Sequence, residues 1–259
     1  MTETKTKEVL SFAVELGDIM LRNGGEVYRI EDSILAILNA YNIEDYDVYV
    51  LSNGIFASAD ETTAHSGSMI RHVPMLDMNL GRISALNSLC RDVCNKTISI
   101  EDAWERLNQC KKEVYYNTIQ LVIATGIGCG GFAYLYGGSI LDAIIAILVG
   151  FILKIALNSF KKETSKAVKN VLGSAIVSIV AILIYIAGAP VHYDKIIIGG
   201  IMPLVPGIPL TNSIRDFINS DYLSGSIRLI DALLTAFCIA VGVGVVITFA
   251  HIIGGGVLL

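Results

Sequence analysis

The chain has 259 residues, of which 53% are hydrophobic, and a net charge of −5; its mean hydropathy is +0.62. The negative charge argues against a nucleic-acid-binding protein, which would present a basic surface. Residues 1–113 hold 18 acidic and 11 basic residues, whereas long apolar runs begin near residue 118. Because each run approaches the roughly 20 residues that cross a bilayer, the sequence predicts an α+β domain over residues 1–113 and an all-α membrane domain over residues 114–259.

Helical spacing marks the first two predicted elements. Apolar residues recur every three or four positions over residues 9–20, and the glycines that follow Asn23 supply a C-terminal stop. A second helix begins near Glu26 and keeps one apolar face as far as Tyr41. Its polar residues include Glu26, Arg29, Glu31 and Asp32.

A short antiparallel sheet is predicted next. Residues 46–50 alternate between apolar and polar side chains, and Asn53-Gly54 is a strong hairpin signal. Residues 55–59 form the predicted return strand, and residues 68–73 form a third strand.

Two more helices complete the predicted domain. Helical spacing resumes over residues 80–93, and Ser99 followed by Asp102 resembles a capping box for a last helix. Arg71 on the third strand and Asp77 near a helix start are interpreted as a structural charge pair or a cap. The sequence thus predicts a small sheet with helices on one face.

Neither a catalytic site nor a metal site is predicted in this domain. Asp60, His65 and Ser66 share one polar loop, but a catalytic triad needs positioned partners, and no GxSxG, HExxH or P-loop motif is present. Five cysteines without a CxxC pair indicate reduced thiols. Cys90 and Cys94 share a helix face, but no histidine is nearby, so core packing is favoured over metal binding and no cofactor is predicted.

Five membrane-spanning segments are predicted in the second domain. They cover residues 118–136, 139–157, 168–187, 196–217 and 227–251. Basic residues flank them on one side: Lys111, Lys112, Lys154, Lys161, Lys162, Lys166, Lys169, Arg215 and Arg228. The other side has only Lys195. The positive-inside rule therefore places the N-terminal domain in the cytoplasm and the C-terminus outside, as a multi-pass protein of a bacterial inner membrane.

The fourth segment is interrupted by prolines. Pro203, Pro206 and Pro209 fall within seven residues, and each lacks a backbone donor, so a regular helix cannot pass through all of them. The break is expected to free the carbonyls of Leu204, Val205 and Ile208, which at membrane depth are tolerated only beside protein or a wet cavity. The sequence therefore predicts that this break, with Gly207, shapes a path for a polar solute. The alternative is a helix that is kinked for packing alone.

Polar residues near the break are candidate ligands for such a solute. Asn212 and Arg215 can hold a carboxylate, since arginine offers a planar bidentate fork, whereas Arg215 and Asp216 can equally mark the inner membrane boundary. Asp142 and Asp231 are the other acids of the membrane segments, each close to a segment end. Either can carry a coupling proton or be a boundary residue.

Two groups of motifs resemble the threonine/serine exporter family, and together they cover nearly the whole chain. The first comprises Gly24-Gly25-Glu26-Val27-Tyr28-Arg29-Ile30-Glu31-Asp32, the Asn53-Gly54-Ile55-Phe56 turn and Asp77-Met78-Asn79-Leu80. The second comprises Pro203-Leu204-Val205-Pro206-Gly207, Asn212, Arg215-Asp216, Asp221 and Ser224-Gly225. The resemblance implies export of threonine and serine or, in split bacterial forms, of dicarboxylates such as succinate.

The chain departs from the full-length type of that family, which has about ten transmembrane segments in two related halves. A single set of five segments resembles the large subunit of the split type, which works with a small membrane subunit similar to the missing half. The resemblance thus implies an exporter subunit for a small carboxylate-bearing metabolite, with that small subunit as its partner. The predicted pathway residues are Pro203, Pro206, Gly207, Pro209, Asn212, Arg215 and Asp216.

Two other hypotheses stay open. A membrane-anchored enzyme would hydrolyse a substrate with residues 1–113 and use the helices as an anchor. The broken segment argues against this hypothesis, because an anchor gains nothing from buried prolines. A scaffold or sensor would bind a ligand in the cytoplasmic domain and gate its membrane partner, so ligand-induced thermal stabilisation without turnover would favour it.

Overall fold

A computed structural model of the chain describes residues 3–60, 67–74, 78–113, 116–161 and 163–253. The chain divides into two compact units, Met1–Tyr115 with Thr211–Leu229 and Tyr116–Leu210 with Ile230–Leu259. Residues 211–229 therefore make their contacts with the N-terminal part of the chain. The domain boundary predicted at residue 113 stays a prediction.

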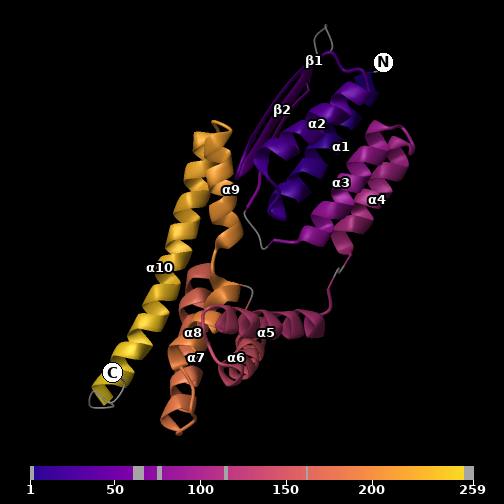
Figure 1. Cartoon of the computed structure of the whole chain (residues 1–259). Coiled ribbons are helices and arrows are strands. Elements are labelled where there is room, and N and C mark those ends of the chain that lie inside the picture. Colours follow the sequence, from indigo (N-terminus) through magenta and orange to yellow (C-terminus); the bar gives the residue numbers. More distant parts are fainter. Residues whose placement is uncertain (1–2, 61–66, 75–77, 114–115, 162, 254–259) are drawn as a thin grey trace. The chain divides into compact units, whose positions relative to one another are not determined.

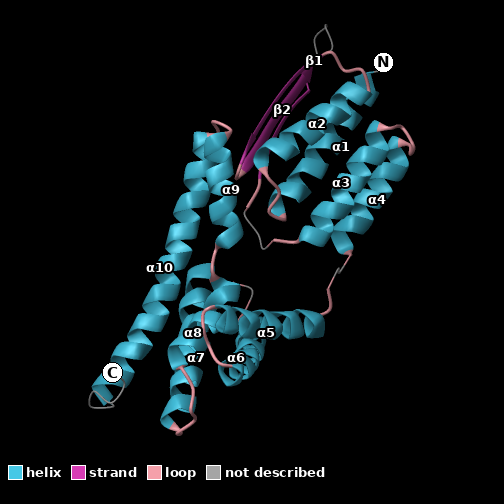
Figure 2. Ribbon diagram, in the orientation of Figure 1, coloured by secondary structure: helices cyan, strands magenta, loops and turns pink. Residues whose placement is uncertain are grey.

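The N-terminal part of the first unit combines helices with a small sheet. Its described elements (Figure 1) are α1 Glu3–Arg22, α2 Val27–Ala40, β1 Asp45–Leu51, β2 Gly54–Asp60, β3 Gly67–His72, α3 Leu80–Cys94 and α4 Ile100–Lys112. The strands form an antiparallel sheet in the order β1-β2-β3. Helices α1 and α2 cover one face of the sheet, and α3 and α4 pack against these two helices (Figure 2).

Turn and cap chemistry sets the ends of these elements as predicted, with one shift. The β1–β2 hairpin is confirmed, but its two-residue loop is Ser52-Asn53, because Leu51 pairs with Gly54. Ser99 caps α4 by accepting the backbone N–H of Asp102 at 3.1 Å. The first turn of a helix has unpaired N–H groups, so such a side-chain acceptor stabilises it.

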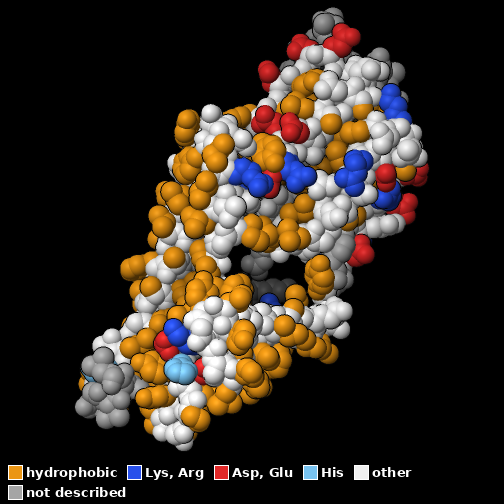
Figure 3. Space-filling view, viewed as in Figure 1, with side chains coloured by type: hydrophobic (Ala, Val, Ile, Leu, Met, Phe, Trp, Pro, Cys, Tyr) orange, Lys and Arg blue, Asp and Glu red, His pale blue; other side chains and the backbone are white. Residues whose placement is uncertain are grey.

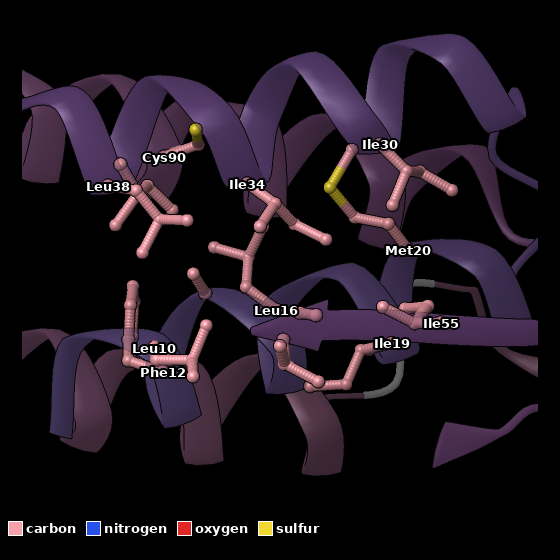
Figure 4. Close-up of a cluster of buried hydrophobic side chains, with 14 of the residues drawn as sticks. Leu10, Phe12, Leu16, Ile19, Met20, Ile30, Ile34, Leu38, Ile55 and Cys90 are labelled. Carbon is pink, nitrogen blue, oxygen red and sulfur yellow. The ribbon is translucent and has the colours of Figure 1, made fainter. Parts of the chain in front are cut away.

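The core of the first unit lies between the sheet and α1 and α2, and it reaches α3 (Figure 4). Its largest buried side chains include Leu10, Phe12, Leu16, Met20, Ile30, Ile34, Leu38 and Ile55. Phe12 also meets Trp104 of α4 edge-on, with ring centroids 5.4 Å apart. Full burial of an apolar side chain of this size is worth about 1.5–3 kcal/mol, so this part of the chain has a hydrophobic core of its own.

The second unit consists of long apolar helices. Its described elements are α5 Thr118–Leu135, α6 Ile140–Ser159, α7 Lys166–Ile186, α8 Tyr193–Ile201 and the 3-10 turn η1 Met202–Leu204, and it shares α9 Gly207–Ile218 and α10 Tyr222–Ile253 with the first unit. In the described part of the chain, four helices are long and apolar enough to cross a membrane, or up to five spans if α8–η1 and α9 together form one. The predicted number of five is the upper of these counts.

Helix α10 begins at Tyr222, earlier than the predicted segment start at residue 227, and has 32 residues. At 1.5 Å per residue it is roughly 48 Å long, more than the ~30 Å of a hydrocarbon core. Hydropathy detects only the apolar part of such a helix. Large hydrophobic side chains cover much of its visible surface (Figure 3), and Leu233, Leu234, Phe237 and Phe249 are among those exposed. These outward side chains suit contact with lipid.

Glycines allow close helix contacts in the second unit. A Cβ atom added to Gly150 of α6 would lie 2.8 Å from the Cα of Gly126 in α5. A Cβ added to Gly199 of α8 would lie 2.5 Å from the carbonyl oxygen of Cys129 in α5. Small residues at such positions let membrane helices pack backbone to backbone. Helices α5, α6 and α8 therefore form the packed centre of this unit.

Candidate functional site

The predicted proline break is present in the structure. Helix α8 ends at Ile201, the 3-10 turn follows over Met202–Leu204, and α9 begins at Gly207. The two helical pieces are bent by 58°. A continuous helix over this stretch is therefore excluded, as the proline spacing predicted.

Each proline occupies a position that needs no N–H group. Pro203 lies in the 3-10 turn, Pro206 precedes α9, and Pro209 lies in the first turn of α9, where the N–H groups have no partner within the helix. The expectation of a free carbonyl at Val205 is wrong, because this oxygen accepts the N–H of Gly207 at 2.9 Å. Gly207 is exposed.

Helix α9 buries a polar face. Asn212, Ser213 and Asp216 are at most 8% exposed, whereas the side chain of Arg215 is 45% exposed. Residues 212 and 216 are one helical turn apart, so their side chains share a face of α9. Arg215, next to this face, is the accessible cation of the helix.

Charged residues from the two family-like motifs meet inside the first unit. The guanidinium of Arg215 forms an ion pair with the carboxylate of Glu26, which immediately precedes α2. On α10, Arg228 donates from Nη2 to the carbonyl oxygen of Gly25 at 2.9 Å. Its Nε lies 3.5 Å from Oδ2 of Asp216, close enough for an ion pair. Residues 25–26 and residues 215–228, distant in sequence, thus build one charge cluster.

The β1–β2 hairpin also contacts the beginning of α10. The N–H of Ser52 donates to Oγ of Ser224 at 3.1 Å, and the N–H of Ser224 donates to Oδ1 of Asp221 at 3.3 Å. These bonds tie the sheet to the segment that carries Arg228. The segment is therefore fixed against the N-terminal elements at two separate points, by the arginine and by the serine.

Glu31 lies beside this contact and caps a strand rather than binding a cation. Its Oε2 accepts the N–H of Val50 in β1 at 3.2 Å. Burial raises the pKa of Glu31, the hydrogen bond from Val50 opposes this rise, and the negative charges of Asp32 and Asp221 add to it. Burial and nearby negative charges both disfavour the ionised form of this carboxylate.

Several buried oxygen atoms of this region accept no hydrogen bond within the ranges that the structure describes: Glu26 Oε2, Ser52 Oγ, Ser213 Oγ and Asp216 Oδ2, of which the last has only its ion pair with Arg228. Leaving a buried acceptor unpaired costs about 1–3 kcal/mol. The cluster can therefore accept N–H or O–H groups from water or from a solute. Among the same residues, no group of three or more His, Cys, Asp or Glu side chains is arranged to hold a metal ion.

The other residues of the N-terminal motif have structural surroundings. Gly24 ends α1 with a φ of +86°, a left-handed conformation that glycine adopts without strain. Asp32 is exposed on α2, and the carbonyl oxygen of Asn53 accepts the N–H of Val73 at 2.9 Å. Of the N-terminal motif, Glu26 takes part in the charge cluster. Gly24 and Asn53 instead act through their backbone conformation and backbone hydrogen bonds.

Arg71 and Asp77 were interpreted as a charge pair or a cap. Nη2 of Arg71 lies 3.7 Å from Oε2 of Glu15 in α1. Asn79 caps α3, because its Oδ1 accepts the N–H of Arg82 at 3.0 Å. Asp77 lies outside the described residues, as do His65 and Ser66 of the polar loop. The observed partner of Arg71 is thus a helix residue that periodicity did not identify.

Asp142 is a fully buried capping residue of α6. Its Oδ2 accepts the N–H and the hydroxyl of Ser139 at 2.7 and 2.8 Å, and its Oδ1 accepts the N–H of His192 at 2.8 Å. The ring Nδ1 of His192 lies 2.9 Å from Oδ2. Asp142 therefore joins the start of α6 to the start of α8.

Asp231 of α10 has a simpler environment. Its Oδ2 accepts a hydrogen bond from Nζ of Lys166, at the start of α7, at 2.7 Å. Both side chains are partly exposed, 36% for Asp231 and 55% for Lys166. Asp142 and Asp231 belong to the second unit, whereas Glu26 and Arg228 belong to the first.

Sequence reasoning missed the role of Arg228. By sequence, Arg228 is treated only as a basic residue beside a span. Its side chain is 8% exposed, and it contacts Gly25 of the first group of motifs and Asp216 of the second. A signal was available, since a cation inside a long apolar helix is tolerated only with a partner. Ser52, Ser213 and His192 gave no such signal, because isolated polar residues of these types are common.

Several helices long and apolar enough to cross a membrane, with one further helix pair broken at prolines, are typical of a multi-pass membrane protein. A family model for threonine/serine exporters, ThrE, matches residues 11–250. The chain therefore belongs to the threonine/serine exporter family, as its two groups of motifs predicted.

Two curated relatives agree with this membership. The threonine/serine exporter of Corynebacterium glutamicum is 26% identical over 254 residues, which cover 95% of this chain and 52% of that protein. A probable threonine/serine exporter of Mycobacterium tuberculosis (strain ATCC 25618 / H37Rv) is 25% identical over 241 residues, covering 92% of this chain and 45% of that protein. The chain spans about half the length of these relatives. No solved structure matches it.

Proposed function

We propose that this chain is a subunit of an inner-membrane exporter that moves a small carboxylate-bearing metabolite out of the cell: threonine, serine or a dicarboxylate such as succinate. The observation that carries the proposal is the bent, proline-interrupted span, whose α9 bears buried polar residues and an accessible arginine. Lipid penalises buried polar and charged side chains, so a broken span that carries them suits a polar path and not a plain anchor. Membership of the exporter family supports the same activity.

The predicted pathway residues divide into two roles. Pro203, Pro206, Gly207 and Pro209 shape the break and keep regular helix out of it. Arg215 binds the solute carboxylate through its guanidinium fork, and Asn212 adds an amide. Asp216 holds Arg228 near the site, which keeps the local charge balanced.

Proton coupling through Asp142 or Asp231 is part of the proposal. Asp231 suits the role better, because it is partly exposed and its protonation would release Lys166. Asp142 is less suited, since both of its oxygens already accept hydrogen bonds that hold α6 to α8.

Charge supports the proposed topology, and the resemblance to the split type of the family supports the proposed partner. Basic residues concentrate at one end of the spans, which supports a cytoplasmic N-terminal domain and an external C-terminus. The curated relatives are about twice as long as the matched region. A small membrane subunit that corresponds to their remaining half is the proposed partner.

Metabolite efflux tests this function. Cells lacking both genes would be complemented with this chain, with the small subunit or with both, and the release of threonine, serine and succinate would be measured. We expect efflux only with both proteins, and its loss in Arg215→Lys with normal membrane insertion. Arg91→Lys, an exposed change on α3, is the matched control. Efflux with this chain alone would refute the two-subunit proposal, and absence of efflux with both proteins would refute the exporter.

A further inference from the structure

Glu26 holds an unusual position at the start of α2. It is the N-cap residue of this helix, yet within the described ranges its side chain makes no capping hydrogen bond. The carboxylate instead pairs with Arg215 of α9, and its second oxygen, Oε2, is buried without a donor. The N-cap carboxylate, which also has a side-chain hydrogen bond with Tyr28 of α2, thus leaves the first-turn N–H groups of its helix and meets the residue that the proposed exporter uses for its solute.

The backbone around Glu26 is held firmly, so the side chain is the part that can move. Arg228 binds the carbonyl oxygen of Gly25 at 2.9 Å. Gly25 also fits tightly, because an added Cβ would lie 2.9 Å from the carbonyl oxygen of Met20. A fixed backbone with a rotatable carboxylate can direct that carboxylate to different partners without moving α2.

Two partners compete for this carboxylate. The first is Arg215, whose side chain is 45% exposed and therefore reachable by a solute. The second is the first turn of α2, whose unpaired N–H groups a residue at the N-cap can bond. A displaced Glu26 side chain therefore has donors within reach, which lowers the cost of leaving Arg215.

We propose that Glu26 is a gating residue that occupies Arg215 in place of the solute carboxylate; this rests on the proposed exporter function. Glu26 and the solute carry the same functional group, and Glu26 neutralises the charge that attracts the solute. Solute binding exchanges one carboxylate for another on the guanidinium, and Glu26 turns to cap α2. A solute without a carboxylate cannot make this exchange, so the gate adds selectivity.

The gate has a measurable effect on apparent affinity. If Glu26 occupies Arg215 about 90% of the time, the apparent dissociation constant of the solute is roughly tenfold weaker than its intrinsic value. Glu26→Gln removes the competing charge, so we expect a half-saturating concentration lower by up to about tenfold. Glu26→Asp keeps the charge but caps helices better than glutamate, so it should also favour the open gate.

Transport into inside-out membrane vesicles tests this inference, because the cytoplasmic side then faces the medium. Initial rates would be measured against the concentration of L-threonine and of succinate, with this chain and the small subunit present. We expect a lower half-saturating concentration in Glu26→Gln and Glu26→Asp, and no change in the control Asp47→Asn, an exposed acid on β1. The thermal stabilisation of purified protein by the transported solute should reach half its maximum at a correspondingly lower concentration in both Glu26 variants.

The outcomes separate the two proposals. Transport by the wild type with an unchanged or higher half-saturating concentration in both Glu26 variants would overturn the gate and leave the exporter standing. Reduced protein levels or thermal stability without an affinity change would also overturn it, since that is the result of a merely structural pair. A wild type that transports neither solute would overturn the exporter and the gate together.

Discussion

Replacing Arg228 by methionine removes the cation at the centre of the charge cluster. The side chains of Arg228 and Asp216 are 8% and 2% exposed, so solvent cannot compensate either charge. The change leaves the Asp216 carboxylate buried without its counter-ion and removes the hydrogen bond to Gly25. Removing one partner of a buried ion pair costs about 3–5 kcal/mol, which lowers the ratio of folded to unfolded protein by roughly 10² to 10³-fold or more.

Thermal unfolding of the full chain in lipid nanodiscs measures this effect. At about 2–4 °C per kcal/mol, the midpoint should fall by about 6–20 °C. The double variant Asp216→Asn/Arg228→Met should lose less stability than the sum of the two single changes, because it leaves no uncompensated charge. Arg91→Met on the exposed side of α3 is the control. A midpoint for Arg228→Met within 2 °C of wild type, or strict additivity in the double variant, would show that Arg228 and Asp216 do not form a buried ion pair.

Three further predictions concern packing, pH and thiol reactivity. Gly199→Ala should lower the free energy of unfolding by about 1–3 kcal/mol, because the added methyl would lie 2.5 Å from the carbonyl oxygen of Cys129 in α5. The control Gly128→Ala should not lower it, because the space around Gly128 is open. Burial raises the pKa of Glu31 in the folded chain above its ordinary value of 4.5. The stabilisation from protonated Glu31 is therefore complete below about pH 4.5, and it is lost as the pH rises through the folded-state pKa. In Glu31→Gln, the thermal unfolding midpoint should therefore depend less on pH in this window. Burial raises the pKa of the Cys90 thiol to about 12, so iodoacetamide at pH 8 should alkylate the half-buried Cys110 well before Cys90 in the native chain.

Each of these has a contradicting result. Equal stability of the two glycine variants would show that α5 and α8 do not pack as described. A Glu31→Gln variant with the pH profile of the wild type would show that this carboxylate is not buried against β1. Equal alkylation rates of Cys90 and Cys110 in native protein would show that the core around α3 is open.

Local sequence patterns located the elements well, because apolar spacing and turn residues act over a few positions. The hairpin at residues 52–53, the cap at Ser99 and the break near Pro203 all lie where the pattern predicted them or within one residue. The prolines were informative for a physical reason: a missing N–H disrupts a helix whatever surrounds it.

Long-range pairing could not be read in this way. Glu26 and Arg215 are 189 residues apart, and neither periodicity nor composition relates them. Arg228 was assigned to a membrane boundary because hydropathy windows average over a helix and ignore single buried contacts. The start of α10 was missed for a similar reason, since its first residues are less apolar than the rest.

If water and solute reach the proline break within the membrane, cysteines placed at the break will react with aqueous reagents. Val205 and Ile208 at the break, and Leu234 on the outward face of α10, would each be replaced by cysteine in a chain whose five native cysteines are removed. Membrane vesicles would then be treated with a charged, water-soluble maleimide. We expect labelling at positions 205 and 208, slowed by L-threonine or succinate, and no labelling at position 234. Break positions as unreactive as position 234 would contradict this expectation.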